Sequence, residues 1–485
     1  LPVNNIHAVS VSMPTLQEVI DYEENTNGIH DKIKSAYPRF VLHPYLKQMA
    51  TYLQKKYDIS NKYEIIVVSS SKAVALISDK YFIHNPIVIN EPFGVILVLK
   101  GTCQIDKVLT YIQHVGCNLS SRFAQDYLYE RGLLDTLHEE ELEIATNSEE
   151  IVLSTLAKAY DQPVENICLA PSGMNAVYSV LEGLKAIQNK NNRNVLVQLG
   201  WLYLDTMNIV KNHYGQTKLF LDINALDELE IYLEENGNNT AAIVTEVPTN
   251  PLLITVDVQR LKSICNKYNI PLVIDATFAT PYNLDLKPYA DIYIESLTKY
   301  ACGNADVLMG AVILNENCTL SHCSAEFFKH ADKPYIKDIQ RLAFEIQNYE
   351  SRMKKINKNA TKLVAYLKTK SFIDTIYYAL DEKNKENYSK LMRYEDAIGG
   401  VISLTFTKPF AAVYDSLNFA KGPSLGTEFT LLMPYVYLAH YDLIITKQGQ
   451  ELLKQNNIPV DLMRVAVGVE NIDDIINEFE KLDNI

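Results

Sequence analysis

Short apolar runs in the middle of the chain predict strands that are buried on both faces. The runs are rich in β-branched residues and do not alternate strictly with polar residues, which is typical of a parallel sheet covered by helices. They lie at 194–198, 241–245, 272–274, 291–294 and 309–314. Segments with helical spacing separate them, so residues 146–330 are predicted to form an α/β domain with a doubly wound, mostly parallel sheet.

The first block, residues 1–145, is predicted to be an N-terminal extension with mixed structure. Apolar runs at 64–68 and 94–99 predict strands, and the spacing around 45–53 predicts a helix. The acidic segment 139–150 predicts a surface helix that leads into the next domain.

The last block, residues 331–485, is predicted to be a smaller α+β C-terminal domain. It begins with a long polar stretch of helical character at 336–369. Strand-like runs follow at 401–406 and 463–467. It ends in a helix with one apolar face, made of Ile472, Ile475, Ile476, Phe479 and Leu482.

Composition narrows the class of protein. The chain has 485 residues, 47% of them hydrophobic and 21% charged, which fits a soluble globular protein of two or three domains. A net charge of −14 argues against nucleic-acid binding, which needs clustered Lys and Arg. The seven cysteines show no metal-ligand spacing and indicate a reducing compartment. No run approaches the roughly 20 apolar residues of a membrane span, and residues 1–5 lack signal-peptide features, so we expect a cytoplasmic protein without a membrane partner.

Two predicted strands are followed by residues that can take part in catalysis or cofactor binding. Lys299 follows the run 291–294, and Asp275 ends the run 272–274. In such sheets, ligands bind at the carboxyl ends of strands. A lysine can form a Schiff base with an aldehyde, a carboxylate can keep a pyridine nitrogen protonated, and the hydroxyls of Ser296 and Thr298 can hold a phosphate. Together they predict a pyridoxal 5'-phosphate (PLP) site, although a Thr-Lys pair alone is usually a solvated lysine after a strand.

Two further segments can contribute to this crevice. Residues 171–176 precede a helix-like run, and small residues at a helix start leave backbone N–H groups free to bind an anion. The turn at 246–251 holds Asn250 between two prolines, which can direct its amide into the crevice. Read alone, the first is a common N-cap and the second is only a turn.

Arg464 lies inside the apolar run 463–467 and needs an anionic partner there. The planar guanidinium suits a substrate carboxylate. A structural ion pair is an equally good interpretation of the sequence alone.

These motifs, in this order, resemble those of the Cys/Met-metabolism PLP enzymes. That family includes cystathionine γ-synthases, cystathionine lyases and methionine γ-lyases, and it implies the PLP-dependent transferase fold type I. The matching motifs lie at 172–174, 248–251, 275–281, 296–300 and 464–470. Segments that are similar to fungal-type cystathionine γ-synthases lie at 7–15, 37–40 and 421–427.

The resemblance implies a role for each residue of the site. Lys299 would hold the cofactor and move protons, Asp275 would pair with the pyridine nitrogen, and Tyr203 would stack on the ring. The other cofactor contacts would come from Gly173, Met174, Ser296, Thr298 and Asn250. The substrate would contact Arg464, Ser424 and Asn250.

The chain also departs from the family pattern. The loop that usually carries Tyr-Ser-Arg reads Ser120-Ser121-Arg122, so the tyrosine is lost. Arg122 is still expected to reach the cofactor phosphate of a neighbouring subunit in a homodimer or homotetramer with shared sites. A family helix motif is replaced at 344–350, so the substrate-side wall is expected to differ there. Glu428 lies in the region that sets substrate choice in the family, and the sequence assigns it no role.

The expected function is PLP-dependent γ-replacement on an O-acylated homoserine, with cysteine as the nucleophile and cystathionine as the product. Replacement by sulfide or a carbon nucleophile, or elimination by a C–S β/γ-lyase, are the enzymatic alternatives. A non-catalytic protein with this fold is disfavoured, because Lys299, Asp275 and Arg464 are all intact.

Overall fold

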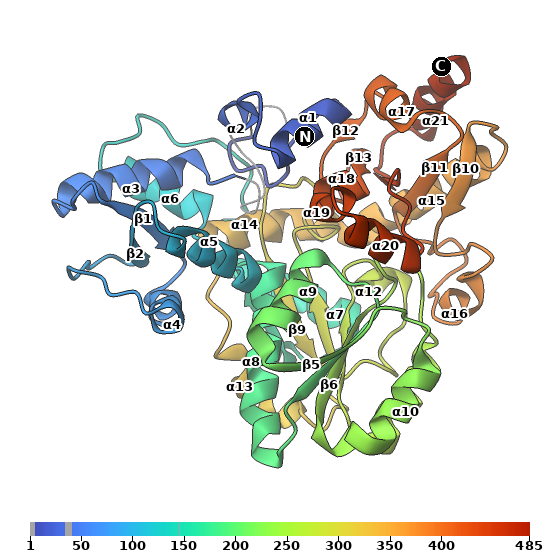
Figure 1. Cartoon of the computed structure of the whole chain (residues 1–485), viewed down its shortest axis with the longest axis horizontal. Helices are drawn as coiled ribbons and strands as arrows, with labels where there is room; N and C mark the ends of the chain where they lie inside the picture. The colour runs from blue at the N-terminus through green and yellow to red at the C-terminus, as the bar shows by residue number, and fades with distance from the viewer. Residues whose placement is uncertain (1–4, 34–40, 145) are drawn as a thin grey trace.

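A computed structural model describes residues 5–33, 41–144 and 146–485. Leu1 to Asn4 and the segment 37–40, which were used above, lie outside the described residues. Figure 1 shows a central α/β domain with the N-terminal extension on one side and the C-terminal domain above it. The domain boundaries at 145 and 330 stay a prediction.

The central sheet has seven strands in the order β3-β9-β8-β7-β6-β4-β5. Strands β4 to β8 run parallel, whereas β9 runs antiparallel to both of its neighbours. The predicted mostly parallel sheet is confirmed, with β3 and β5 as strands that the apolar runs did not reveal. The strands are β3 Ile167–Ala170, β4 Val195–Leu199, β5 Gln216–Phe220, β6 Thr240–Glu246, β7 Leu272–Asp275, β8 Ile292–Glu295 and β9 Gly310–Leu314.

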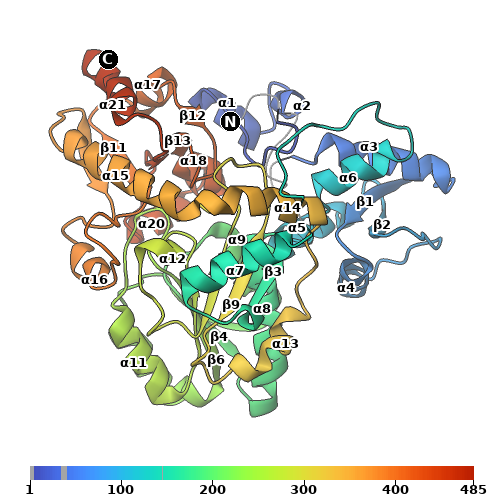
Figure 2. The ribbon, with the colours of Figure 1, turned by 180° about the vertical axis from the view of Figure 1, so that it is seen from behind.

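Helices cover both faces of this sheet. Successive residues of β7 point to opposite faces, so Val273 belongs to one apolar cluster and Ile274 to the other. Figure 2 shows α7 across the face that is turned away from the viewer in Figure 1. The helical segments are α7 Ser148–Tyr160, η1 Val164–Asn166, α8 Gly173–Gln188, η2 Asn189–Asn191, α9 Leu204–Ile209, η3 Val210–Tyr214, α10 Leu226–Asn236, η4 Gly237–Asn239, α11 Val258–Tyr268, α12 Thr280–Asn283, η5 Ser321–Cys323 and α13 Ser324–Phe328.

The C-terminal domain holds a five-stranded, mainly antiparallel sheet in the order β10-β11-β14-β13-β12. Its strands are β10 Ile373–Tyr377, β11 Val401–Phe406, β12 Ala420–Lys421, β13 Leu431–Pro434 and β14 Met463–Ala466. Its helical segments are α14 Ile336–Glu345, η6 Ile346–Asn348, α15 Tyr349–Leu367, α16 Lys385–Ser389, α17 Phe410–Ser416, α18 Tyr435–Ala439, α19 Tyr441–Ile444, α20 Lys447–Gln455, α21 Ile472–Glu480 and η7 Lys481–Asn484. The strands predicted at 401–406 and 463–467 and the final helix are confirmed.

The long helix predicted at 336–369 is interrupted by the 3₁₀ turn η6. The guanidinium of Arg352 donates to the carbonyl of Glu345, 3.1 Å away, at the end of α14. A side chain that takes this carbonyl replaces the bond of a continuous helix, so two helices form where the pattern predicted one.

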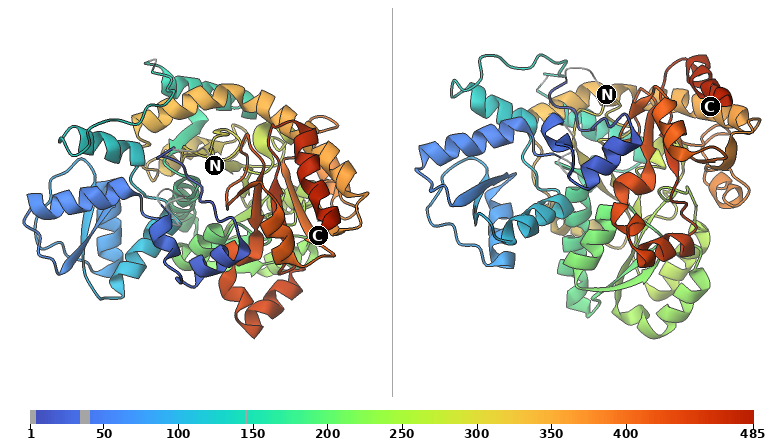
Figure 3. Two further views of the ribbon diagram at one scale, coloured as in Figure 1. Left: turned by 90° about the horizontal axis from the view of Figure 1, so that it is seen from above. Right: turned by 45° about the horizontal axis from the view of Figure 1, so that its top comes forward.

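The N-terminal extension divides into two parts. The first, with α1 Leu16–Glu23 and α2 Ile29–Lys32, places Val11, Met13 and Val19 in an apolar cluster with Met433 and Tyr435 of the C-terminal domain. The second is built on an antiparallel strand pair and lies on the opposite side of the molecule from the C-terminal domain (Figure 3). It comprises α3 Pro44–Lys56, β1 Tyr63–Val68, α4 Ser71–Tyr81, β2 Gly94–Leu99, α5 Gln104–Val115 and α6 Ser121–Tyr129.

The surface helix predicted at 139–150 is wrong. Helix α7 begins only at Ser148, and residues 139–144 form no helix. Glu140 pairs with Arg122 at 2.6 Å, and the amide of Glu143 bonds to the carbonyl of Gln340 on α14. The side chain of Glu140 and the backbone of Glu143 therefore hold an irregular segment against α6 and α14, whereas Glu139, Glu141, Glu149 and Glu150 are exposed.

All seven cysteines are free thiols in this structure. Among the described residues, no group of His, Cys, Asp and Glu is arranged to hold a metal ion. None of the helices in the described ranges is both long and apolar enough to cross a bilayer.

Candidate active site

A pocket at the carboxyl edge of the central sheet collects most of the residues predicted from the sequence. Its lining includes Gly173, Met174, Tyr203, Asn250, Asp275, Ser296, Lys299 and Arg464. A smaller adjoining pocket shares Tyr203, Asn250, Lys299 and Arg464 and adds Ser424. The strand register explains the convergence, because Glu246 of β6 lies opposite Asp275 of β7, which lies opposite Ile294 of β8.

Lys299 lies at the junction of the two pockets, just after β8. Its Nζ donates a hydrogen bond to Ser424 Oγ at 3.3 Å. Burial, with the nearby charge of Arg464 as the second cause, lowers the pKa of Lys299 to about 7. A substantial share of the amine is therefore uncharged at neutral pH, as a nucleophile or base requires.

The segment 421–427 packs directly against this lysine. Gly426 has a φ of +75°, and an added Cβ would lie 2.5 Å from the amide nitrogen of Tyr300. Only glycine permits that backbone conformation without strain at such a close approach. This contact fixes Ser424 beside Lys299.

The half-buried Asp275 forms an acid pair with the buried Glu246, which the sequence analysis did not single out. One carboxylate oxygen of Asp275 accepts from the amide of Thr277 at 2.9 Å, and no ion pair holds it among the described residues. Burial raises the pKa of both carboxyls, and the charge of Asp275 raises that of Glu246 further. One oxygen of Glu246 accepts from the amide of Tyr203, whereas its Oε2 has no hydrogen-bond partner in the described structure. The pair would be stabilised by a cationic ligand.

The opposite end of the pocket suits an anion. Gly173 and Met174 open α8, whose N-cap Ser172 accepts from the amide of Asn175. The Oγ of Ser296 is buried and has no hydrogen-bond partner in the described part of the chain. A Cβ on Gly173 would lie 2.9 Å from the Cβ of Ser296 and would fill this space. Backbone N–H groups, a helix dipole and an unpaired hydroxyl together fit a phosphate.

Thr298 does not join this anion site, contrary to the expectation from the resemblance. Its hydroxyl donates to the carbonyl of Met309 and accepts from the amide of the same residue, both at 3.1 Å. The hydroxyl satisfies a buried backbone segment that leads into β9, and Thr298 does not line the pocket.

Tyr203 is held at both ends of the residue. Its amide bonds to Glu246, and its hydroxyl donates to Asp205 at 3.0 Å. Asp205 is buried and also accepts from Gln113 of α5 at 2.8 Å. The N-terminal extension thus takes part in orienting an aromatic ring that lines both pockets, a connection between residues far apart in sequence.

Arg464 has no carboxylate partner among the described residues. Its guanidinium donates to Asn250 Oδ1 at 3.2 Å and to the carbonyls of Pro423 and Ser424 at 2.7 and 3.0 Å. Its Nε is buried and has no partner in the described ranges. Burial lowers its pKa to about 10, so it keeps its charge at neutral pH. Of the two interpretations left open by the sequence, this geometry favours a site for a ligand carboxylate.

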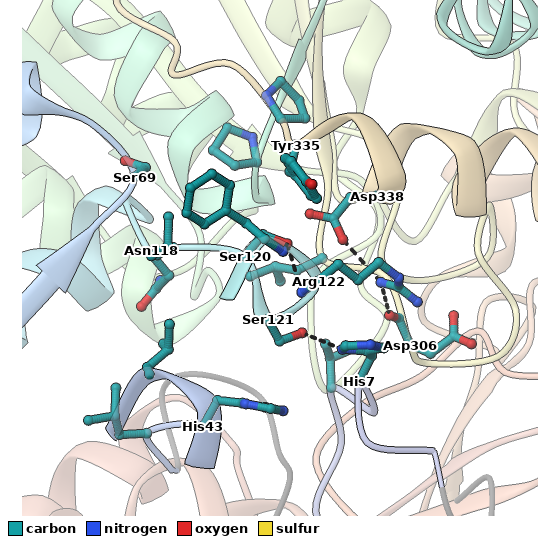
Figure 4. Close-up of a pocket in the computed structure, with 18 of the residues that line it drawn as sticks. His7, His43, Ser69, Asn118, Ser120, Ser121, Arg122, Asp306, Tyr335 and Asp338 are labelled. Carbon is teal, nitrogen blue, oxygen red and sulfur yellow. Dashed lines mark hydrogen bonds and ion pairs between the residues drawn. The ribbon is translucent and has the colours of Figure 1, made fainter. Parts of the chain in front are cut away.

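Arg122 does not lie in the pocket but beside a separate cavity of about 300 Å³ (Figure 4). Its guanidinium is bound within its own chain, to Glu140 at 2.6 and 2.7 Å, to Asp338 at 3.0 Å and to the carbonyl of Asp306 at 2.8 Å. A contact with the phosphate of a neighbouring subunit would require these ion pairs to open. Glu140 accepts two of these hydrogen bonds. The sequence analysis placed Glu140 on a surface helix and therefore did not predict that it would bind Arg122.

The substrate-side wall does not involve the residues expected from the sequence. Glu428 pairs with Arg352 at 3.0 Å, and the hydroxyl of Tyr349 donates to Glu295 at 2.7 Å. Neither residue lines the adjoining pocket or the main pocket. The wall is apolar instead and comes from Val9, Leu204, Met433, Tyr435, Leu438 and Ala439.

The pocket fits PLP, and Ser296 offers a test of this fit. Ser296→Ala is expected to weaken PLP binding about 10- to 100-fold, because a hydrogen bond to a charged group is worth about 1.5–3 kcal/mol. The cofactor-free protein should keep its stability, because the Ser296 hydroxyl has no partner to lose. Titration by cofactor absorbance and thermal unfolding would measure the two effects.

Ser179→Ala is the matched control for this prediction. Ser179 lies on α8 and is buried, and its hydroxyl donates to the carbonyl of Phe327 at 2.6 Å. Its loss should destabilise the fold without changing PLP affinity. Unchanged PLP affinity in Ser296→Ala would contradict the phosphate assignment.

Comparison with known proteins identifies the family. A family model described as Cys/Met metabolism PLP-dependent enzyme matches residues 144–482. The L-2-amino-4-chloropent-4-enoate dechlorinase/desaturase of Streptantibioticus cattleyicolor is 35% identical, over 96% of this chain and 94% of that protein. The cystathionine γ-synthase of Neurospora crassa is 32% identical, over 65% of this chain and 51% of that protein.

Solved structures agree at the level of the fold. Cystathionine γ-lyase from Lactobacillus plantarum, complexed with L-serine, superposes with a TM-score of 0.59 at 22% identity, over 72% of this chain and 91% of that one. Cystathionine γ-synthase from Xanthomonas oryzae pv. oryzae, in complex with cystathionine, also superposes with a TM-score of 0.59. Its sequence is 19% identical, and the superposition covers 72% of this chain and 89% of that one. The chain therefore belongs to the Cys/Met-metabolism family of PLP-dependent enzymes, with fold type I.

Proposed function

We propose that this enzyme uses PLP to remove a leaving group from the γ-carbon of a compact L-amino acid, without adding a second amino acid to the product. The observation that carries this proposal is the small size and mainly apolar wall of the adjoining pocket that contains Lys299, Ser424 and Arg464. This pocket is called the substrate pocket below. The nearly full-length similarity to a dechlorinase/desaturase, whose substrate name places chlorine on the fourth carbon, supports the proposal.

The substrate pocket has a volume of about 40 Å³. Among its described lining residues, only Lys299 and Arg464 carry charge. Arg464 would be occupied by the α-carboxylate of the substrate. A succinyl or phosphate leaving group, or the carboxylate of an incoming cysteine, would need a further cation in this apolar space. The pocket therefore favours a compact side chain with an uncharged end.

Each residue of the site contributes one part of this reaction. Bound PLP supplies the electron sink. Arg464 holds the substrate carboxylate and so directs the α-hydrogen toward Lys299, which carries protons between substrate carbons. Asp275 keeps the ring nitrogen protonated, and Gly173, Met174 and Ser296 hold the phosphate. Tyr203 covers the ring face.

The second candidate is γ-replacement on an O-acylated homoserine with cysteine, which yields cystathionine. It is supported by the cystathionine γ-synthases of Neurospora crassa and of Saccharomyces cerevisiae, the latter 25% identical over 99% of this chain and 97% of that protein. Replacement by sulfide or a carbon nucleophile belongs to the same candidate. Assembly as a homodimer or homotetramer stays a prediction from the family resemblance.

A product assay separates the two candidates. The PLP-loaded enzyme would receive L-2-amino-4-chloropent-4-enoate or O-acetyl-, O-succinyl- or O-phosphohomoserine, each with and without cysteine. Mass spectrometry should show loss of the leaving group from the chlorinated substrate at the same rate in both arms, because no second amino acid is needed. Cystathionine that forms only with cysteine would overturn the proposal in favour of γ-replacement.

A further inference from the structure

The first residues of the described chain cross from one cavity to another. His7 and Ala8 line the cavity of about 300 Å³ in Figure 4, together with Val9. Val9 also lines the substrate pocket of about 40 Å³ that contains Lys299 and Arg464. It is the residue that these two linings share in the described structure. The buried side chain of Val9 thus stands between a small reactive pocket and a much larger space.

This segment is fixed at several points along its backbone. The amide of Val9 donates to the carbonyl of Ala305 at 2.7 Å. The carbonyl of Met13 accepts from the hydroxyl of Tyr414 at 2.8 Å. Next to these bonds, the carbonyl oxygen of Val11 would lie only 2.1 Å from a Cβ added to Gly422. The close fit means that Val9 cannot withdraw without breaking these contacts.

The start of the segment is held in the cavity of Figure 4. His7 Nδ1 and Ser121 Oγ form a hydrogen bond of 2.9 Å. Burial, followed by the charge of Arg122 and the neighbouring His43 and His138, lowers the pKa of His7 to about 2. The imidazole is therefore neutral in ordinary buffers. Protonation of His7 does not detach the segment at these pH values.

We propose that Val9 is a specificity-determining residue that limits the length of the substrate side chain. A side chain that extends from the α-carbon between Lys299 and Arg464 meets the isopropyl group of Val9, and the space behind it becomes available only when that group is removed. The substrate class is thus L-amino acids with short, apolar side chains. This inference rests on the proposed function only for the orientation of the bound amino acid.

The test is the binding of unreactive straight-chain amino acids to the PLP-loaded enzyme. Calorimetry would give dissociation constants for L-2-aminobutyrate, L-norvaline, L-norleucine and L-2-aminoheptanoate. In the wild-type protein, affinity should rise by about 4-fold per added methylene until the wall is reached. It should then fall by about 5-fold or more, because overpacking is unfavourable. Affinity that rises through the whole series would overturn the proposal.

We call the chain length at which affinity begins to fall the break. Val9→Ala should move the break by at least one methylene toward longer side chains. Val19→Ala is the matched control, because Val19 lies in the same N-terminal part and is fully buried but lines neither pocket. Its break should stay at the wild-type length. An unmoved break in a Val9→Ala protein that retains PLP absorbance would overturn the inference.

Val9→Leu keeps the test open if the alanine variant does not fold, and it should move the break toward shorter side chains. An unmoved break in this variant would also contradict the role of Val9. The series has no γ leaving group, so its result is independent of the product assay. If the break moved but the elimination assay gave no product, the proposed reaction would be rejected. The role of Val9 in limiting side-chain length would still be supported.

Discussion

Replacing Lys299 by alanine is expected to lower turnover by more than about 10⁴-fold while the protein stays folded. Proton transfer by a positioned side chain contributes about 10²- to 10⁴-fold by itself, and Lys299→Ala also removes the amine that attaches the cofactor. The fold should persist, because the side-chain bond to Ser424 is long at 3.3 Å and burial already disfavours the charged amine.

Steady-state rates, the cofactor absorption band and thermal unfolding would be measured on the same preparation. Lys354→Ala is a suitable control, because Lys354 is an exposed lysine of α15 that pairs with Glu350. Surface pairs of this kind contribute at most about 1 kcal/mol. If Lys299→Ala retained turnover within 10-fold of the wild-type enzyme, the central assignment of the site would be wrong.

Asp275→Asn is expected to reduce turnover by about 10²- to 10⁴-fold with little change in structure. Asparagine has the shape of aspartate but cannot supply a negative charge opposite the ring nitrogen. Removing one member of a buried ion pair costs about 3–5 kcal/mol, which corresponds to this range of rates. The same substitution should shift the absorption of bound PLP, because the protonation of the ring changes.

Asp291→Asn provides the comparison for this substitution. Asp291 pairs with Lys262 and accepts from the amide of Leu272 at the start of β7, at the opposite edge of the sheet. Its loss should destabilise the fold and leave the PLP spectrum unchanged. A normal spectrum and normal turnover in Asp275→Asn would show that another group, such as Glu246, balances the ring charge.

The sequence predicted those parts of the site that depend on local pattern and chain order. Apolar runs located five of the seven central strands, since a strand buried on both faces needs continuous apolar residues. Asp275 and Lys299 could be placed at one edge because the carboxyl ends of parallel strands meet there. The start of α8 was predicted from a different local signal, the small residues that precede a helix-like run.

The tertiary structure decided which side chains bond to one another. Thr298 binds the backbone of Met309, and Arg122 binds Glu140 and Asp338, so neither lies in the cofactor pocket. The sequence pattern could not predict this, because a hydroxyl or a guanidinium pairs with whatever the fold brings within about 3 Å.

The pocket walls show the same division. The chemistry of the site was predictable from Lys299, Asp275 and Arg464, since few residue types can perform it. Its size was not, because Val9 reaches the pocket from a segment nearly 300 residues away from Lys299 in the chain. Local composition determines which elements form and which edge is reactive, whereas long-range packing determines what fits there.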